Sequence, residues 1–294
     1  MEGMIKAISA AEKAFTREGC QAGIREDGRG LTDQRELSVE TDVLPHVNGS
    51  ARIKIADVID VLCSVKAEVH CLEPHMAQQR GLLEVTAEFS PSCNVKLDDR
   101  KLASIGSHLS QQLQGVLLNS LESSLESSKT FVIIPGRFCW CLHISLLITR
   151  LNGDPLDACS MAIYAALSVT KIPKLEPVTG PSGQLDDFEV VGDVDDAITF
   201  SARDVPICTT FAKVDRVFVV DASASEHACA SMALAVATDK QGKCCGLFKL
   251  HGGGTFTEDE LNAALQDAKS LAPSIFALLD EGIEAHKITH MHQG

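Results

Sequence analysis

The stretch from Cys139 to Pro173 constrains the fold more than any other part of this sequence. Residues 142–151 are apolar and almost uninterrupted, which predicts a strand buried on both faces. Residues 152–153 are Asn-Gly, which turns the chain, and Asp154-Pro155-Leu156-Asp157 opens a helix rich in Ala, Met, Ile and Leu. Such a strand, turn and buried helix is a typical core unit, and it predicts an α/β fold.

The start of this predicted helix bears directly on function. A helix N-terminus offers free N–H groups and a partial positive charge, which many phosphate-handling enzymes use to hold an anion. Here Asp154 is placed to cap the helix, Pro155 takes the first position without losing a donor, and Asp157 adds a second carboxylate in the first turn. The pattern favours a helix start whose own side chains occupy the anion site over a phosphate cradle.

Composition sets the class of protein. The 294 residues are 45% apolar, enough for one large or two small globular domains. Eleven Cys occur without CxxC pairs at zinc-finger spacing, so we expect a reducing compartment, with Cys139 and Cys141 packed as small hydrophobic residues. The first thirty residues lack the apolar core of a signal peptide, and no apolar run reaches the roughly eighteen residues that span a bilayer. These observations predict a soluble, intracellular protein with no membrane partner.

Charge argues against a free-standing nucleic-acid binder. The formal net charge is −14, whereas such proteins gain affinity by neutralising phosphates with Lys and Arg. With one Trp and one Tyr, the chain also lacks the aromatic side chains of a base-stacking platform. Any RNA contact is therefore expected to be local or shared with partners.

In the first half, an amphipathic helix is expected at 9–18 and a longer one at 98–121. Alternating apolar residues predict antiparallel strands over 37–43 and 50–71, joined by a turn at 46–50, with further strands at 81–90 and from 130 to 134. The Ser-rich segment 120–128 is expected to be a surface loop or a helix end, and 173–196 an exposed connection.

A charged cluster lies between the first helix and the first strand. Arg25, Asp27, Arg29 and Arg35 surround an Asp-Gly turn. Two interpretations are open: an Asp–Arg network that holds a loop in place, or a contact with RNA or another subunit.

In the second half, strands are expected at 196–201, 205–214, 216–221 and 243–250, with a buried helix at 225–237 and a capped helix at 259–272. The glycines at 252–254 lack the Gly-x-x-x-x-Gly-Lys-Ser/Thr pattern, which favours a strand-to-helix turn over a phosphate loop. His286, His290 and His292 lie near the end of the chain, where a frayed terminus is favoured over a metal site.

Several motifs resemble the RNase PH family. They are Arg25-x-Asp27-Gly28-Arg29 with Arg35, Glu40-Thr41-Asp42, Gly49-Ser50-Ala51-Arg52, Val65-Lys66-Ala67-Glu68, Cys139-Trp140, and Asn152-Gly153 with Leu156-Asp157-Ala158. Within the family they are most similar to eukaryotic exosome ring subunits, over nearly the whole chain. The resemblance implies a single two-layer α/β (α+β) RNase PH-like domain over 1–294, with pseudo-symmetric halves at about 1–175 and 197–294 and a connection at about 176–196.

The resemblance also implies partners and a location. Related RNase PH-like subunits would complete a ring of six, S1/KH subunits would cap it, and RNA would pass through the shared channel to a separate nuclease. It implies a place in the nucleus, nucleolus and cytoplasm.

Active members of the family carry residues that this sequence lacks. Their phosphate cradle, of Thr/Ser-Arg type, aligns with Pro155 and Leu156, and their two acids, six residues apart, align with Ser225 and Ser231. Asp221 and Glu226 remain nearby and are interpreted as a cap or surface charges. The comparison implies a chain with no catalytic residue, no metal site and no cofactor.

The RNA-binding residues of the family are also replaced. Archaeal relatives use arginines along the helix that matches 98–121, where this chain has Ser107, Gln111 and Gln114. Candidates for contact with RNA or another subunit are Arg25, Arg29, Arg35 and Lys101.

The sequence thus predicts a non-catalytic scaffold subunit of the RNA exosome ring, supporting 3'-to-5' RNA processing and degradation. Two alternatives stay open. One is an active phosphate-dependent 3'-to-5' exoribonuclease that uses displaced acids, Asp221 and Glu226. The other is a small-molecule α/β enzyme that binds a nucleotide at the loop 251–255.

Overall fold

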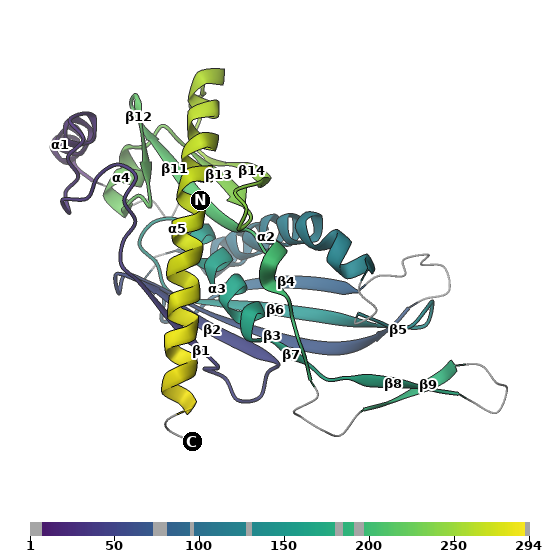
Figure 1. The fold of residues 1–294 in the computed structure, drawn as a ribbon. Helices are drawn as coiled ribbons and strands as arrows, with labels where there is room; N and C mark the ends of the chain where they lie inside the picture. The colour runs from purple at the N-terminus through teal and green to yellow at the C-terminus, as the bar shows by residue number, and fades with distance from the viewer. Residues whose placement is uncertain are drawn as a thin grey trace.

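The structure, a computed structural model, describes residues 8–72, 81–94, 97–127, 131–179, 185–190 and 197–291. Within these ranges the chain forms two large sheets, one from each half of the sequence (Figure 1). Helices α2 (Asp99–Ser127) and α3 (Pro155–Val169) contact strands of both sheets. The α/β class expected from the sequence is therefore confirmed, and the layers meet around α3.

The first sheet has the strand order β1-β2-β3-β6-β4, with β5 paired to β6. Its strands are β1 (Leu37–Thr41), β2 (Gly49–Ile55), β3 (Ile59–Cys71), β4 (Leu82–Phe89), β5 (Val132–Ile134) and β6 (Phe138–Arg150). All neighbours are antiparallel except β4 and β6, which are parallel. The strands expected at 37–43, 81–90 and 142–151 correspond to β1, β4 and part of β6. The single strand expected over 50–71 is wrong, because Ala56 and Asp57 have positive φ and form a turn that separates β2 from β3.

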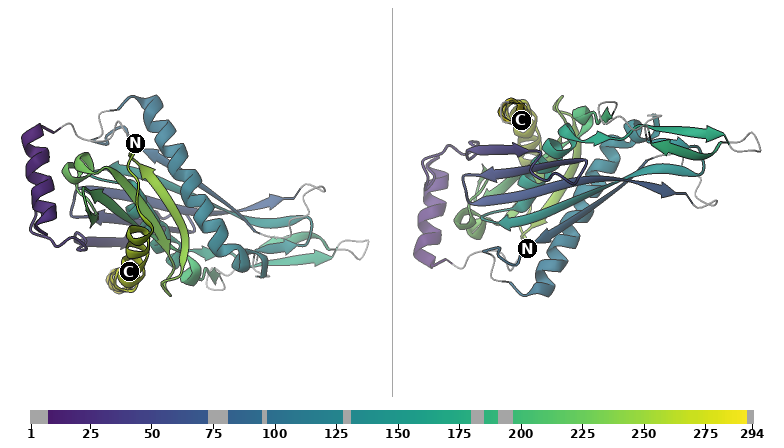
Figure 2. Two further views of the ribbon diagram at one scale, coloured as in Figure 1. Left: turned by 90° about the horizontal axis from the view of Figure 1, so that it is seen from above. Right: turned by 90° about the horizontal axis from the view of Figure 1, so that it is seen from below.

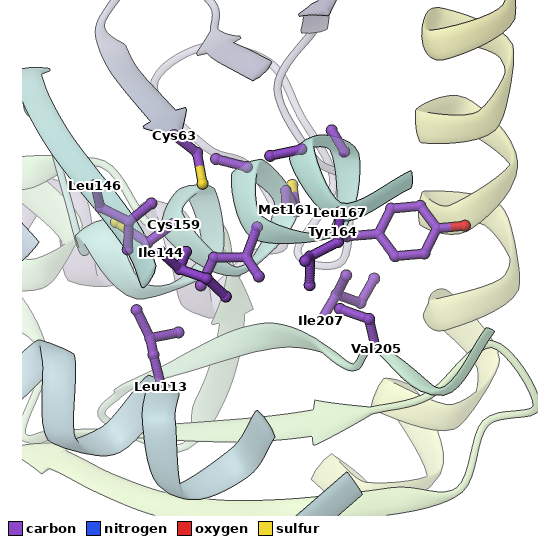
Figure 3. Close-up of a cluster of buried hydrophobic side chains, with 14 of the residues drawn as sticks. Cys63, Leu113, Ile144, Leu146, Cys159, Met161, Tyr164, Leu167, Val205 and Ile207 are labelled. Carbon is purple, nitrogen blue, oxygen red and sulfur yellow. The ribbon is translucent and has the colours of Figure 1, made fainter. Parts of the chain in front are cut away.

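The two faces of β6 have different surroundings. Ile144, Leu146 and Ile148 are buried on the side of α2 and α3, where they pack with residues such as Leu113 and Cys159 (Figure 3). On the opposite face Ser145 is exposed and Leu147 is 37% exposed. The prediction that this strand is buried on both faces is therefore wrong. The helices cover one face of the first sheet, and the view from below shows the strands in front of these helices (Figure 2).

Helix α3 is buried along almost its whole length, with Ser168 partly exposed. Its sequence is apolar nearly all round, which is typical of a helix enclosed by other elements. It contacts β2 and β3 on one side and β11 (Ile207–Val214) of the second sheet on the other. The two halves of the chain therefore share one core.

The second sheet has the order β12-β11-β13-β14, all antiparallel. Its other strands are β12 (Val217–Val220), β13 (Met232–Thr238) and β14 (Cys244–His251). The helix predicted at 225–237 is wrong after residue 229, because α4 (Ala224–Cys229) ends there and β13 follows. An Ala-rich apolar run fits a buried helix and a central strand equally well. This run forms a strand because β13 pairs with both of its neighbours, β11 and β14.

The last helix is longer than predicted. Helix α5 runs from Glu258 to Met291 and passes through Pro273, where the sequence pattern suggested an end. Its second part packs against β1, and Gly282 lies so close to Val39 that a Cβ there would come within 2.8 Å of it. The frayed end expected at His286 is wrong, because the Thr41 N–H donates to His286 Nδ1 at 3.2 Å. The side chain of His290 and all of His292 lie outside the described residues.

The connection between the halves contains more structure than predicted. Strands β8 (Leu175–Thr179) and β9 (Leu185–Val190) form an antiparallel pair that extends beyond the first sheet (Figures 1 and 2). Two short strands, β7 (Lys171–Ile172) and β10 (Ile198–Thr199), pair at its base. The predicted Gly-rich turn at 180–183 lies outside the described residues, as do Ser128 and Thr130 of the predicted loop and strand.

Other expectations are met at the first helix and at the Cys pair. Helix α1 (Ala10–Gln21) begins with a capping box between Ser9 and Glu12, and α2 reaches Ser127, so the Ser-rich segment is a helix end over its described part. Cys139 and Cys141 are buried, as predicted for small hydrophobic residues. No helix in the described ranges is long and apolar enough to cross a membrane.

Candidate functional site

A pocket of about 410 Å³ opens at the start of α3. Residues of α2, of the end of β14 and of the start of α3 line it. The lining residues are Ser104, Ile105, His108, Leu109, Gln112, Pro155, Leu250, His251 and Gly252. Neither Lys nor Arg is among them, so the lining offers no permanent positive charge.

The helix start beside this pocket uses its own donors. The Leu156 N–H donates to Asp154 Oδ1 at 3.0 Å, and Pro155 has no N–H to offer. The Leu156 side chain is 1% exposed and points into the core. Burial raises the pKa of Asp154 to about 6, and its backbone hydrogen bond from Leu156 partly offsets this rise. An incoming anion would meet this carboxylate rather than a free donor.

Asp157 lies in the first turn of α3, as predicted, but its carboxylate is bound by a residue of the second sheet. Its carboxylate accepts hydrogen bonds from the Thr210 N–H at 2.8 Å and from the Thr210 hydroxyl at 2.6 Å. Thr210 belongs to β11, so this contact joins α3 to the second sheet. Burial raises the pKa of Asp157 well above its usual range, although the bonds from Thr210 oppose the shift.

Two histidines that sequence reasoning did not pair meet beside the pocket. His227 Nδ1 lies 3.1 Å from His251 Nε2, between α4 and the end of β14. Burial, and next the neighbouring His251, lower the pKa of His227 to about 4, and burial also lowers the pKa of His251. Both rings are therefore largely neutral at pH 7, so this pair adds no fixed cation to the site. The two residues lie 24 positions apart, so no local motif could have revealed the pair.

The glycines after His251 make a strand-to-helix turn, as predicted. Gly252 has a φ of +86° and approaches the Ser231 carbonyl so closely that a Cβ would lie 2.1 Å from its oxygen. The Gly254 N–H donates to the same carbonyl at 3.2 Å. This part of the loop is thus held by the protein's own backbone.

The N-terminal arginines are held by acids within the chain, and an RNA or subunit contact at Arg25, Arg29 or Arg35 stays a prediction. The Arg25 side chain is buried against Glu226 at 2.7 Å, and it also donates to the Val220 and Asp221 carbonyl oxygens. Arg29 and Arg35 both bind the Asp221 carboxylate, at 3.0 and 2.5 Å. The structure therefore favours the other interpretation, an ion-pair network that fixes the loop.

The same network accounts for both remaining acids. Each carboxylate is held by at least one arginine, so neither Asp221 nor Glu226 is a surface charge. The interpretation as a cap is confirmed for Glu226. Glu226 also completes a capping box with Ser223 at the start of α4. Asp221 has a φ of +48° and receives the Arg35 backbone N–H at 2.9 Å, so it fixes an unusual backbone turn.

The two serines predicted to stand in place of the family's acids occupy different environments. Ser225 is partly buried in α4, whereas Ser231 is exposed between α4 and β13, where its hydroxyl donates to the Lys213 carbonyl at 3.3 Å. Neither offers a carboxylate. The described residues thus place no pair of unpaired acids beside the pocket.

The polar face of α2 serves partly to close the sheet. Ser110 Oγ accepts a hydrogen bond from the Ala87 N–H at 2.8 Å, and the Gln114 amide contacts the backbone of Leu83 and Val85. These side chains occupy the free edge of β4, which would otherwise present unpaired groups. Lys101 is exposed one turn before Ser104, so it is the one predicted contact residue that reaches solvent freely near the pocket.

Family models match both halves of the chain. The 3' exoribonuclease family (RNase PH), domain 1, matches residues 33–173, and domain 2 of the same family matches residues 204–270. The chain belongs to the RNase PH family. The two matches leave the segment between them, which contains β8 and β9, outside the family models.

Relatives and solved structures agree with this assignment. The chain is 26% identical to a Dictyostelium discoideum protein named putative exosome complex exonuclease RRP42, over 95% of this chain and 99% of the relative. It is 29% identical to the exosome complex component Rrp42 of Sulfurisphaera tokodaii, over 94% and 95%. A chain of the Archaeoglobus fulgidus exosome with RNA bound to the active site has a TM-score of 0.74 at 22% identity, covering 91% of this chain and 97% of that one. At this identity the structural likeness shows the RNase PH-like fold.

Proposed function

We propose that this chain is a non-catalytic subunit of an exosome-type ring, where it completes the hexamer and bounds the RNA channel. The relatives named Rrp42 support the assignment to the exosome, since they match the chain over nearly their full length. The site geometry supports the absence of catalysis. In this role the chain aids 3'-to-5' RNA processing and degradation by holding its neighbours in place.

The observation that carries the proposal is the start of α3. Phosphorolysis needs a cationic or N–H-rich site that orients inorganic phosphate for attack. Here Asp154 already accepts the Leu156 N–H, and Pro155 has no donor. The adjoining pocket contains His251, which is largely neutral at pH 7 because burial lowers its pKa.

The acids support the same conclusion. A divalent metal or a proton-transfer role requires carboxylates that are free to bind. Asp221 is bound by Arg29 and Arg35. Glu226 is bound by Arg25, and releasing it would leave this buried arginine unpaired. These two acids are therefore structural in our proposal.

The proposal extends to partners and location. The sequence motifs are most similar to the eukaryotic ring subunit called exosome complex component seven. The partners would be the other RNase PH-like ring subunits, S1/KH cap subunits, and RNA in the shared channel. The protein would work in the nucleus, nucleolus and cytoplasm. Its negative charge would then face complementary surfaces on its neighbours.

Native mass spectrometry of the complex purified from cells tests ring membership. We expect this chain in a heteromeric assembly that also contains related ring subunits, with a fixed copy number. A chain that stays a soluble monomer, with no affinity for related ring subunits, would contradict the proposal.

An active phosphate-dependent exoribonuclease is the second candidate. It is favoured by the name of the Dictyostelium relative, which calls that protein an exonuclease. Replacing Asp221 and Glu226 would not test it cleanly, because Glu226 holds the buried Arg25 and Asp221 holds the partly buried Arg35. The diagnostic result is instead the release of nucleoside diphosphates from RNA that depends on added phosphate.

A nucleotide-binding enzyme is a third candidate, favoured by the pocket that includes His251 and Gly252. Gly253 gives a clean test, because a Cβ there meets no atom within 4 Å. Nucleotide-dependent thermal stabilisation that Gly253→Leu abolishes would favour this candidate. We expect neither the stabilisation nor an effect of the substitution.

A further inference from the structure

The open face of the first sheet brings together side chains of three metal-ligating types. Cys141 and His143 are two residues apart on β6, so they project from the same face, and Glu84 on β4 lies directly beside His143. One ligand atom from each of the three residues lies within 4.8 Å of the other two. In the described ranges, no other group of three His, Cys, Asp or Glu side chains meets this criterion.

We propose that Cys141, His143 and Glu84 form a Zn²⁺ site, with Cys141 Sγ, His143 Nδ1 and a Glu84 carboxylate oxygen as ligands. Thiolate, imidazole and carboxylate together suit Zn²⁺ better than Mg²⁺ or Ca²⁺, which prefer oxygen ligands. This site is separate from the pocket at α3 and does not depend on the proposed ring function.

The distances suit an ion of this size. Tetrahedral zinc with ordinary bond lengths holds its nitrogen, oxygen and sulfur ligands roughly 3.3 to 3.6 Å apart. In the structure His143 Nδ1 lies 3.1 Å from Glu84 Oε2. All three ligand atoms lie within 4.8 Å of one another, so zinc binding requires side-chain rotations that bring each pair to about 3.3 to 3.6 Å.

Glu68 supplies an orienting contact. Its Oε2 lies 3.6 Å from His143 Nε2, and its other oxygen is held by Lys66. A metal-bound histidine commonly directs its second ring N–H to a carboxylate, which fixes the ring and its tautomer. With Nδ1 on the metal and Nε2 toward Glu68, three protein ligands leave a fourth position for water.

The local environment couples binding to loss of a proton. Cys141 is 2% exposed, and zinc binds the thiolate form of cysteine rather than the thiol. Binding therefore forms one zinc–sulfur bond and releases the thiol proton to solvent as one H⁺.

Cobalt(II) titration of the full-length chain, kept reduced and free of chelators, tests the site. We expect a near-ultraviolet thiolate-to-cobalt charge-transfer band and visible bands of tetrahedral cobalt, saturating at one equivalent and bleached by Zn²⁺. Cys141→Ser should remove the charge-transfer band. Cys244→Ser is the matched control, because Cys244 is an exposed thiol on another sheet, and it should keep the spectrum.

Two exposed positions keep the test independent of folding. Glu84→Gln should weaken Zn²⁺ binding at least tenfold, and Glu68→Gln by roughly 10- to 100-fold, as for other orienting carboxylates. Circular dichroism checks that each variant is folded. A wild-type chain without the charge-transfer band, or a band that Cys141→Ser retains, would overturn the proposal and leave an ordinary His–Glu ion pair.

Discussion

Arg25 and Glu226 form a buried ion pair joined by two hydrogen bonds of 2.8 and 2.7 Å. The pair links the loop after α1 to α4, across 201 positions of sequence. Because both side chains are buried, removing one leaves the other as an uncompensated charge in the interior. This contact fixes the N-terminal loop on the second sheet and accounts for an arginine that resembles an RNA ligand in the sequence.

Arg25→Ala is expected to lower the free energy of unfolding by about 3 to 5 kcal/mol, the usual effect of breaking a buried pair. Arg17→Ala is the matched control, because Arg17 lies 3.9 Å from Asp215 at the surface. Arg17→Ala should lower the free energy of unfolding by less than about 1 kcal/mol. Urea unfolding of both variants measures the difference, and equal losses would show that Arg25 is not buried in solution.

Neighbouring threonines on β11 should respond oppositely to the same substitution. Thr210→Val removes the hydroxyl that donates to the buried Asp157, so it should lower the free energy of unfolding by about 1 to 3 kcal/mol. The Thr209 hydroxyl is buried with no hydrogen-bond partner in the described part of the chain. Thr209→Val should therefore be neutral or stabilising by up to about 1 kcal/mol, because no polar group is then left unpaired. Thermal unfolding of the two variants side by side checks the sign of each change.

The His227–His251 pair should make the fold sensitive to acid. The pKa of His227 falls from 6.5 to about 4 on folding, so between these values the unfolded chain binds more protons than the folded one. Stability is unaffected by this group above pH 6.5 and falls by roughly 3 kcal/mol as the pH drops to 4. Asp154 acts in the opposite direction over part of this range, because its pKa is raised to about 6.

Comparison with His227→Gln isolates the contribution of the histidine. The groups that face it are His251, Glu226, Arg35 and Asp221, and all of them remain in the variant. The variant should lose stability less steeply than the wild type between pH 6.5 and 4. His46→Gln, at an exposed turn before β2, should keep the wild-type slope. A slope that His227→Gln leaves unchanged would contradict the burial of the pair.

Ser110 should matter for stability although it lies on the polar face of α2. Its hydroxyl accepts the Ala87 N–H at the free edge of β4, and Ser110→Ala would leave that donor without its partner. We expect a loss of about 1 to 3 kcal/mol and more association through the freed edge. Ser107→Ala, at an exposed position of the same helix, should change stability by less than about 0.5 kcal/mol. Urea unfolding and light scattering measure the two effects.

The sequence predicted elements well where a single pattern determined them. The alternation over 37–43 and the Asp154 cap of α3 are local signals, and both appear in the structure as predicted. The strand expected over 50–71 is instead divided into β2 and β3 by a turn at 56–58. The pattern over 225–237 predicts a helix, because the apolar and small residues from 232 to 237 fit a helix and a strand equally well, whereas the structure has β13 there. Pairing with β11 and β14 decides its structure, and that information lies outside the segment.

The candidate site was predictable only in part. The capped helix start at Asp154 follows from adjacent residues, so it was found. The roles of Arg25 and Asp221 depend on contacts between segments nearly 200 residues apart, which no spacing rule reveals. The same holds for His227 and His251, which come together when α4 is placed against the end of β14.

The phosphorolysis assay tests most directly whether the chain is catalytic. The purified chain is incubated with RNA, Mg²⁺ and inorganic phosphate, and nucleoside diphosphates are measured with and without the phosphate. Diphosphates report attack by phosphate, whereas a contaminating hydrolytic nuclease releases monophosphates. We expect no phosphate-dependent diphosphate, because Asp154 and Pro155 occupy the anion site and the nearby acids are bound by arginines. Diphosphate release that depends on phosphate and rises in proportion to the concentration of the chain would contradict the account.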